Sequence, residues 1–133
     1  MKNMKYKIIV AIVILTLVSI ATYIYTRPPS DAWRYADLKR AGSNYQRTRS
    51  DSDLKRLEAD KRALIASGYF VEVVIPVSDL SANLKPVKSR LADTFIQSGA
   101  YYEAKLDRGA DKVRLLCRKE DVSMWQKSLQ DYQ

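Results

Sequence analysis

The sequence predicts an α+β protein with an N-terminal transmembrane helix, juxtamembrane helices and a small domain over residues 50–133. Two observations support this fold class. First, the run from Ile8 to Thr26 contains no charged residue, and as a helix it would be about 28 Å long, close to the thickness of the hydrocarbon core of a bilayer. Second, segments with the period of a helix alternate later in the chain with segments rich in β-branched and aromatic residues.

The composition narrows the classes of function that the chain can have. It carries 23 Lys and Arg residues against 15 Asp and Glu, a net charge of +8, with Lys2, Lys5 and Lys7 ahead of the apolar run. This excess predicts a basic, solvated surface, and contact with anionic lipid head groups is the main alternative. The chain has no histidine, the commonest general base and transition-metal ligand, and its single cysteine, Cys117, excludes an intrachain disulfide. We therefore expect no cofactor, no metal and no enzymatic activity.

The apolar run at 8–26 is interpreted as a retained signal anchor that follows a basic tail at 1–7. A cleavable signal peptide is the alternative, because Ser19-Ile20-Ala21 resembles a cleavage site. Apolar and aromatic residues continue past this site, and Tyr23 and Tyr25 are typical of the aromatic belt at a membrane interface. Retention is therefore the favoured interpretation.

The lysines of the tail favour a cytoplasmic N-terminus and an exported C-terminal domain, because cytoplasmic flanks carry the excess of Lys and Arg. The opposite orientation stays open, since four basic residues follow the run closely: Arg27, Arg34, Lys39 and Arg40. The predicted location is thus a membrane that the chain crosses once, with the domain outside the cytoplasm.

Residues 27–49 are expected to form a juxtamembrane helix and a linker. The pair Pro28-Pro29 ends the membrane helix, because proline lacks an amide hydrogen and clashes with the preceding turn. A short helix at 31–41 follows and is expected to break at Gly42-Ser43-Asn44. The polar stretch at 45–49 then leads into the domain.

Caps and turns delimit the expected elements of the domain at 50–133. Ser50 precedes acidic residues that suit a helix N-terminus, and Gly68 and Gly99 each follow a helical pattern, as left-handed C-terminal residues do. A loop at 108–111 separates two strand-like runs and predicts a β-hairpin. In order, we expect a helix at 50–67, a strand at 69–77, a helix at 84–98, strands at 100–107 and 112–119, and a helix at 120–131.

The order strand, helix, strand, strand, helix is the ferredoxin-like βαββα arrangement without its fourth strand. It predicts a three-stranded antiparallel sheet in the order 1-3-2, with the helices on one face. Alternation directs Val113, Leu115 and Cys117 of the central strand toward the helices. Cys117 is therefore expected in the core, and the alternative is a reactive thiol whose pKa the neighbouring Arg118 lowers.

The opposite face of the sheet is predicted to be open and is the candidate interaction surface. Its members are Phe70, Glu72, Val74, Tyr101, Glu103, Arg114, Leu116 and Arg118. Glu72 and Glu103 would lie on the two outer strands with arginines between them, so we expect cross-strand ion pairs rather than a catalytic carboxylate pair. The open face and the missing fourth strand leave room for a partner, or for the chain's own helix at 50–67.

These features predict a non-enzymatic interaction or assembly module of the cell envelope. Its expected partners are the lipid bilayer and either another protein or further copies of the chain, as a homo-oligomer. Nucleic acid is disfavoured as a partner. The same fold builds RNA-recognition modules, but here the central strand offers Arg114, Leu116 and Arg118 and no aromatic ring.

The anchored βαββα order is similar to that of the SPOR domains, which bind the glycan strands of peptidoglycan across a sheet. The resemblance covers Tyr69 to Gln133 and lies in the order of the elements. The fourth strand of that family, with the glycine-aromatic signature at its start, has no counterpart in this sequence. The resemblance implies binding of cell-wall glycan on the open sheet face, as an alternative to a protein partner.

Overall fold

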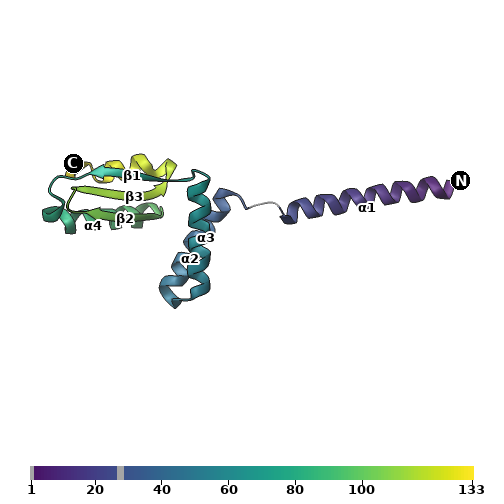
Figure 1. Cartoon of the computed structure of the whole chain (residues 1–133), viewed down its shortest axis with the longest axis horizontal. Helices are drawn as coiled ribbons and strands as arrows, with labels where there is room; N and C mark the ends of the chain where they lie inside the picture. Colours follow the sequence, from purple (N-terminus) through teal and green to yellow (C-terminus); the bar gives the residue numbers. More distant parts are fainter. Residues whose placement is uncertain (1, 27–28) are drawn as a thin grey trace. The chain divides into compact units, whose positions relative to one another are not determined.

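The computed structural model describes residues 2–26 and 29–133, and the chain divides into two compact units, Met1–Ser30 and Asp31–Gln133 (Figure 1). The first unit holds one apolar helix, and the second combines helices with a sheet. The predicted end of the membrane helix at Arg27 and Pro28 lies outside the described residues.

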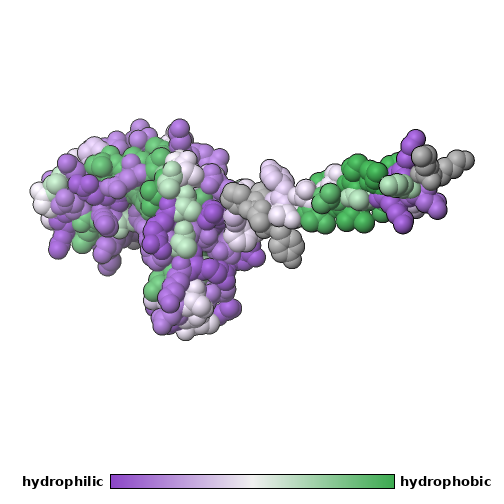
Figure 2. Space-filling model, turned by 45° about the vertical axis from the view of Figure 1, so that its right-hand side comes forward, coloured by the Kyte–Doolittle hydropathy of each residue, from purple (hydrophilic) through white to green (hydrophobic). Residues whose placement is uncertain are grey.

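Helix α1 (Lys2–Thr26) is the apolar element of the first unit. Residues Asn3–Ile24 are long and apolar enough to cross a membrane by length and composition, a property that signal sequences share. The described apolar side chains are exposed, and Figure 2 shows them as a hydrophobic surface along the helix. The hydroxyl of Thr16 donates to the carbonyl oxygen of Ile12 at 2.9 Å, so the helix itself satisfies this polar side chain.

The second unit begins with a helical hairpin of α2 (Asp31–Thr48) and α3 (Asp51–Ala66). The predicted break at Gly42–Asn44, with a linker after it, is wrong, because α2 continues through these residues. Gly42 lies so close to α3 that a Cβ atom on it would be 3.1 Å from Leu57 Cδ1. The close packing of the two helices offsets the cost of about 1 kcal/mol that glycine adds in a helix interior.

The substitution Gly42→Val is expected to lower the free energy of unfolding of the second unit by about 1–3 kcal/mol, because the added methyl groups would push Leu57 away from α2. The measurement is guanidinium unfolding of the full chain in detergent micelles, followed by circular dichroism. The control is Gln46→Val, which places the same β-branched side chain at an exposed position of α2, away from the packed interface of the hairpin. Equal losses for the two variants would contradict a role of Gly42 in the packing of the hairpin.

The sheet contains β1 (Phe70–Pro76), β2 (Tyr102–Asp107) and β3 (Lys112–Arg118). The strand order is β1-β3-β2 and both pairings are antiparallel, which confirms the predicted three-stranded sheet. β2 begins later than predicted, because the amide of Tyr101 donates to the hydroxyl of Tyr35 in α2.

Helix α4 (Leu80–Ser98) follows β1 and ends at Gly99, whose φ of 67° confirms the predicted left-handed stop. It begins about one turn before the predicted start. The side chain of Asp79 caps the first turn, and the carboxylate of Asp111 accepts a hydrogen bond from the amide of Leu80 at 3.0 Å. The start of α4 thus depends on a residue in the β2–β3 loop as well as on its own N-cap.

Three short elements replace the single helix predicted at 120–131: η1 (Lys119–Asp121), α5 (Val122–Ser128) and η2 (Gln130–Tyr132). The amide of Ser78 donates to the carbonyl oxygen of Tyr132 at 2.7 Å. This bond ties the C-terminal turn to the loop after β1, so a contact with a distant segment replaces helical continuation.

The main hydrophobic core lies between one face of the sheet and helices α4 and α5. Val113, Leu115 and Cys117 of β3 are fully buried in it, which confirms the predicted alternation. Trp125 of α5 is the largest fully buried side chain, and its ring centroid lies 4.8 Å from that of Tyr102. With this face covered, the other face of the sheet is the one that remains for the candidate site.

Candidate functional site

The open face of the sheet is divided between two environments. At one end of the sheet, the α2–α3 hairpin covers it (Figure 1). Phe70 is only 2% exposed there, since it packs against Tyr35 and two leucines of the hairpin. Tyr101 and Leu116 are partly buried against the same cluster. Phe70, expected on an exposed surface, is therefore inaccessible to a partner, because the alternation of a strand indicates a face but not what covers it.

Aromatic rings hold together this hairpin junction, which we define as Tyr35, Phe70, Tyr101 and Arg118. Tyr35 meets Phe70 edge-on with 5.9 Å between ring centroids, and Phe70 stacks on Tyr101 at 5.6 Å. The Tyr35 hydroxyl accepts the hydrogen bond from the Tyr101 amide at 2.9 Å. Burial raises the pKa of both phenols, and the carboxylate of Glu103 raises the pKa of Tyr101 further. Both hydroxyls therefore stay protonated and act as fixed hydrogen-bonding groups.

Arg118 completes the hairpin junction. Its guanidinium lies 4.6 Å from the centroid of the Tyr35 ring and donates to the carboxylate of Asp121 at 2.7 and 3.0 Å. An ion pair at 2.6 Å joins it also to Glu120. The hydrogen bonds from Arg118 to Asp121 raise the pKa of the guanidinium, so it is always charged. The structure thus places this predicted surface residue in a network within the chain.

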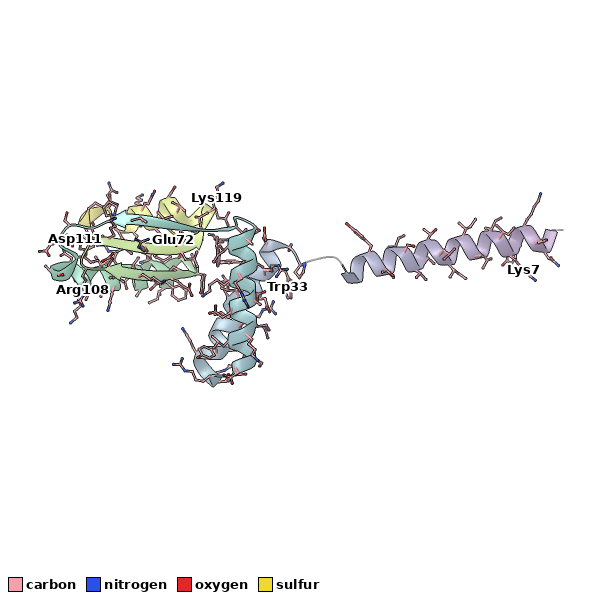
Figure 3. All side chains as sticks on the ribbon, viewed as in Figure 1. Lys7, Trp33, Glu72, Arg108, Asp111 and Lys119 are labelled. Carbon is pink, nitrogen blue, oxygen red and sulfur yellow. The ribbon has the colours of Figure 1, made fainter. Side chains whose placement is uncertain are left out.

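The rest of the open face forms an exposed groove, the open groove. Its lining residues are Ile65, Glu72, Glu103, Lys105, Arg114 and Leu116. Leu116 of β3 lies opposite both Glu72 and Glu103 in the ladder, and Figure 3 marks Glu72 on the sheet. Val74, near the end of β1, is 46% exposed. The structure therefore brings together five of the predicted site residues on an accessible surface, with charges of both signs around a small apolar centre.

Two different ion pairs hold the glutamates of the open groove. Arg114 Nη1 lies 3.6 Å from Glu72 Oε1, which confirms one predicted cross-strand pair. Glu103 pairs instead with Lys61 of α3 at 3.1 Å, and it accepts a hydrogen bond from the Tyr101 hydroxyl at 2.9 Å. Solvent-exposed pairs contribute about 0–1 kcal/mol each, so they determine the charge pattern of the groove more than its stability.

A buried acid pair, absent from the predicted site residues, lies inside the hairpin. Asp37 of α2 is 7% exposed and accepts hydrogen bonds from Arg56 at 2.8 and 3.3 Å. Asp60 of α3 is 6% exposed; burial, and then contact with Asp37, raise its pKa to about 6. Contact with Asp60, followed by the hydrogen bonds from Arg56, lowers the pKa of Asp37. One pattern in the sequence indicates the burial of Asp60: it lies one turn before Leu64 on α3, and therefore on the same buried face of the helix.

Cys117 lies in the core, as predicted. Burial, with a smaller contribution from the carboxylate of Asp121, raises the pKa of its thiol to about 11. The alternative of an activated thiol is therefore wrong, because Arg118 directs its guanidinium to Asp121. Over residues 2–26 and 29–133, no group of three or more metal-ligating side chains gathers.

Comparisons with protein families, with curated proteins and with solved structures found no match to this chain. The function is therefore inferred from the chain's own features: an apolar helix, a sheet covered on one face, and an open groove beside a helical hairpin.

Proposed function

We propose that this chain is a single-pass membrane protein in which α1 anchors a non-enzymatic interaction or assembly module of the cell envelope. The observation that carries the proposal is the combination, in one chain, of a helix apolar enough to cross a membrane with a compact unit that has a partly open sheet. In this proposal the N-terminus is cytoplasmic and Asp31–Gln133 is exported, because three lysines precede the apolar residues.

The order of elements in the second unit supports a ferredoxin-like arrangement that lacks a fourth strand. The chain runs β1, α4, β2, β3, α5, and β3 is the central strand. A sheet of three strands has two edges, and strand edges pair readily with other chains. The side chains of Ile65 and Val74, 47% and 46% exposed, add apolar surface on and beside the open groove. Both features suit a module that binds a protein rather than one that transforms a substrate.

The double substitution Ile14→Arg and Leu17→Arg is expected to release the chain from membranes, because each arginine at the centre of a spanning helix costs about 2.5–3.5 kcal/mol. The unsubstituted chain should stay in the membrane pellet after a carbonate wash, and the double variant should move to the supernatant. The matched control, Ile14→Leu with Leu17→Ile, keeps the hydrophobicity and should stay in the pellet. An unsubstituted chain that is soluble and begins after Ala21 would identify α1 as a signal peptide instead.

Reporter fusions test the orientation separately. A reporter that works only outside the cytoplasm should be active on the C-terminus and inactive on the N-terminus, and a cytoplasmic reporter should give the opposite result. The reverse pattern would keep the anchor and overturn the export of the second unit.

Cell-wall glycan is the alternative ligand of the open groove, supported by the resemblance in element order to SPOR domains. Two features weaken this alternative: Phe70 is buried and Tyr101 is half-buried under the hairpin. The groove is therefore lined by charged and aliphatic side chains, with little aromatic surface for stacking on a sugar ring. Sedimentation of the full chain with purified sacculi should give no enrichment in the pellet, and saturable enrichment would favour the glycan over a protein partner.

A further inference from the structure

The hydrogen bonds between β1 and β3 determine which backbone groups of the sheet point outward. The amide of Val77 donates to the carbonyl oxygen of Asp111, and the amide of Lys119 donates to that of Tyr69, each at 2.9 Å. Backbone groups alternate in direction along a strand, so the odd-numbered residues of β3 bond to β1. The even-numbered residues of β3 therefore bond to β2.

The outer edge of β2 consequently carries free backbone groups. Glu103 lies opposite Leu116, so the odd-numbered residues of β2 bond to β3 and the even-numbered ones face outward. The outward groups are the N–H and C=O of Tyr102, Ala104 and Leu106. Within the described part of the chain, no backbone group pairs with them. The outward residues of β1 include Pro76, which has no amide hydrogen, so β2 is the edge better suited to accept a strand.

On the open face, β2 carries the charged side chains of Glu103 and Lys105, and of these only Glu103 has a partner of opposite charge within the described residues. Lys105 is exposed and lies opposite Arg114 across the ladder, and like charges in this position repel. Arg114 has Glu72 at 3.6 Å, whereas Lys105 forms no ion pair with any described residue. Glu103 points to the same face, and its side chain is 41% exposed. One negative and one positive side chain therefore stand symmetrically about Ala104.

We propose that β2 pairs edge to edge with β2 of a second copy of this chain, antiparallel, about a two-fold axis at Ala104. In this register Tyr102 of each copy lies opposite Leu106 of the other, so the outward backbone groups of both strands complete one ladder. Glu103 of each copy lies directly opposite Lys105 of the other, in the type of pair that brings side chains closest. Each Lys105 thereby gains the anion that its own chain does not supply.

The charge pattern selects this register over the neighbouring ones. A two-fold axis at Glu103 would put the two glutamates face to face, and an axis at Lys105 would do the same with the lysines. An exposed lysine on an edge strand normally discourages pairing. Here it discourages pairing in the wrong register and with strands that lack a carboxylate at the matching position, which favours a second copy over an unrelated strand.

Exposed apolar surface continues from the β2 edge onto α4. Phe95 is 43% exposed, and its ring centroid lies 5.9 Å from that of Tyr102. A six-residue edge is nevertheless small beside the roughly 1,200–2,000 Å² that stable complexes bury. The inference therefore rests on the proposed function, because anchoring of both copies in one membrane supplies the high local concentration that a small interface needs.

Disulfide formation at Ala104→Cys in liposomes tests the register. The two Cα atoms at the axis would be about 5.5 Å apart, within the range that a disulfide spans. The full chain with this substitution is expected to give cross-linked dimer on oxidation. The control is Glu72→Cys, at an exposed position of β1, which should give little cross-linked dimer. The unsubstituted chain should also give little, because its Cys117 is buried. Equal yields from both cysteine variants would overturn the proposal.

Charge reversal tests the partner. In the Ala104→Cys background, Lys105→Glu alone and Glu103→Lys alone should each lower the cross-linked fraction about tenfold, because each creates like-charged pairs. A mixture of the two variants should restore it, since every pair across the axis is then of opposite charge. Cross-linking that is insensitive to these charges would contradict the pairing.

Two further measurements test membrane anchoring separately from edge pairing and check that the variants fold. Flotation of the liposomes before oxidation separates the proposals: chains that fail to float contradict anchoring, whereas chains that float without forming Ala104→Cys dimer contradict edge pairing alone. Near-ultraviolet circular dichroism of the buried Trp125 checks that Glu103→Lys folds despite the loss of its pair with Lys61. If that variant does not fold, the yields of cross-linked dimer from Lys105→Glu and Lys105→Gln are compared instead. Repulsion between Glu103 and the new glutamate predicts a far lower yield for Lys105→Glu, and equal yields would overturn the proposal.

Discussion

Replacement of Phe70 by alanine is expected to lower the free energy of unfolding of the second unit by about 3–5 kcal/mol, a large fraction of the stability of a domain of this size. The side chain is 2% exposed and fills the space between the rings of Tyr35 and Tyr101. These rings cannot close over the cavity freely, because the Tyr35 hydroxyl is bonded to the Tyr101 amide at 2.9 Å. The substitution should therefore loosen the hairpin from the sheet before it disturbs the main core.

The measurement combines guanidinium unfolding of the full chain in detergent with hydrogen exchange of individual segments. Amides of α2 and α3 should exchange faster in Phe70→Ala, while those around Trp125 change less. Tyr35→Phe, which removes only the acceptor of one hydrogen bond, should cost about 1–2 kcal/mol. Val74→Ala, at an exposed position of the same strand, should stay within about 0.5 kcal/mol. A cost below about 1 kcal/mol for Phe70→Ala would refute the docking of the hairpin on the sheet.

Replacement of Asp60 by asparagine is expected to stabilise the second unit at pH 8 by about 1–3 kcal/mol. The pKa of Asp60 is raised from its usual 3.8 to about 6 by burial and by Asp37, so its ionised form is held unfavourably in the hairpin. Asparagine keeps a donor that can face the Asp37 carboxylate, and it carries no charge to bury. The gain should be smaller at pH 5, where Asp60 of the unsubstituted chain is protonated when folded.

The sign of the pH dependence follows from proton linkage. Between pH 3.8 and about 6 the folded state holds a proton on Asp60 that the unfolded state releases, so the unsubstituted chain loses stability as the pH rises through this window. Asp37 has the opposite effect, in a lower pH range. Because its pKa is lowered in the folded state, it contributes stability above its unfolded pKa near 3.8, and this stability is lost as the pH falls through the folded pKa. Unfolding midpoints from pH 5 to 8 should be flatter for Asp60→Asn than for the exposed control Asp93→Asn. Equal slopes would contradict the acid pair.

Local signals in the sequence predict much of the fold. The β-branched and aromatic content at 69–77, the glycines after two helices and the short loop at 108–111 predict the three strands, their order and their inward faces. Gly68 and Gly99 both adopt a positive φ, as a left-handed helix stop requires. These features depend on residues close together in sequence, and neighbouring side chains and backbone sterics suffice to specify them.

The candidate site was predictable only in part. Alternation assigns Glu72, Glu103 and Arg114 to the open face, and the structure places them there. The partner of Glu103 is Lys61, which lies far from it in sequence, so no local pattern indicates this ion pair. The acid pair in the hairpin was not predictable either, because its two members lie on different helices. In addition, aspartate in a helix is usually solvated, so burial is not expected from the residue type.

The apolar span, the order of the strands and the face on which each strand residue lies are predictable from the sequence. Each of these features follows from the period of the hydrophobic residues or from a glycine or capping residue at the end of an element. All of these signals depend on contacts within a few residues of the chain. The continuation of α2 through Gly42 and the position of the hairpin over Phe70 depend instead on the tertiary structure. Both features depend on packing between α2 and elements distant in sequence. The close approach of Gly42 to Leu57 and the burial of the Phe70 ring outweigh the local propensities of the chain.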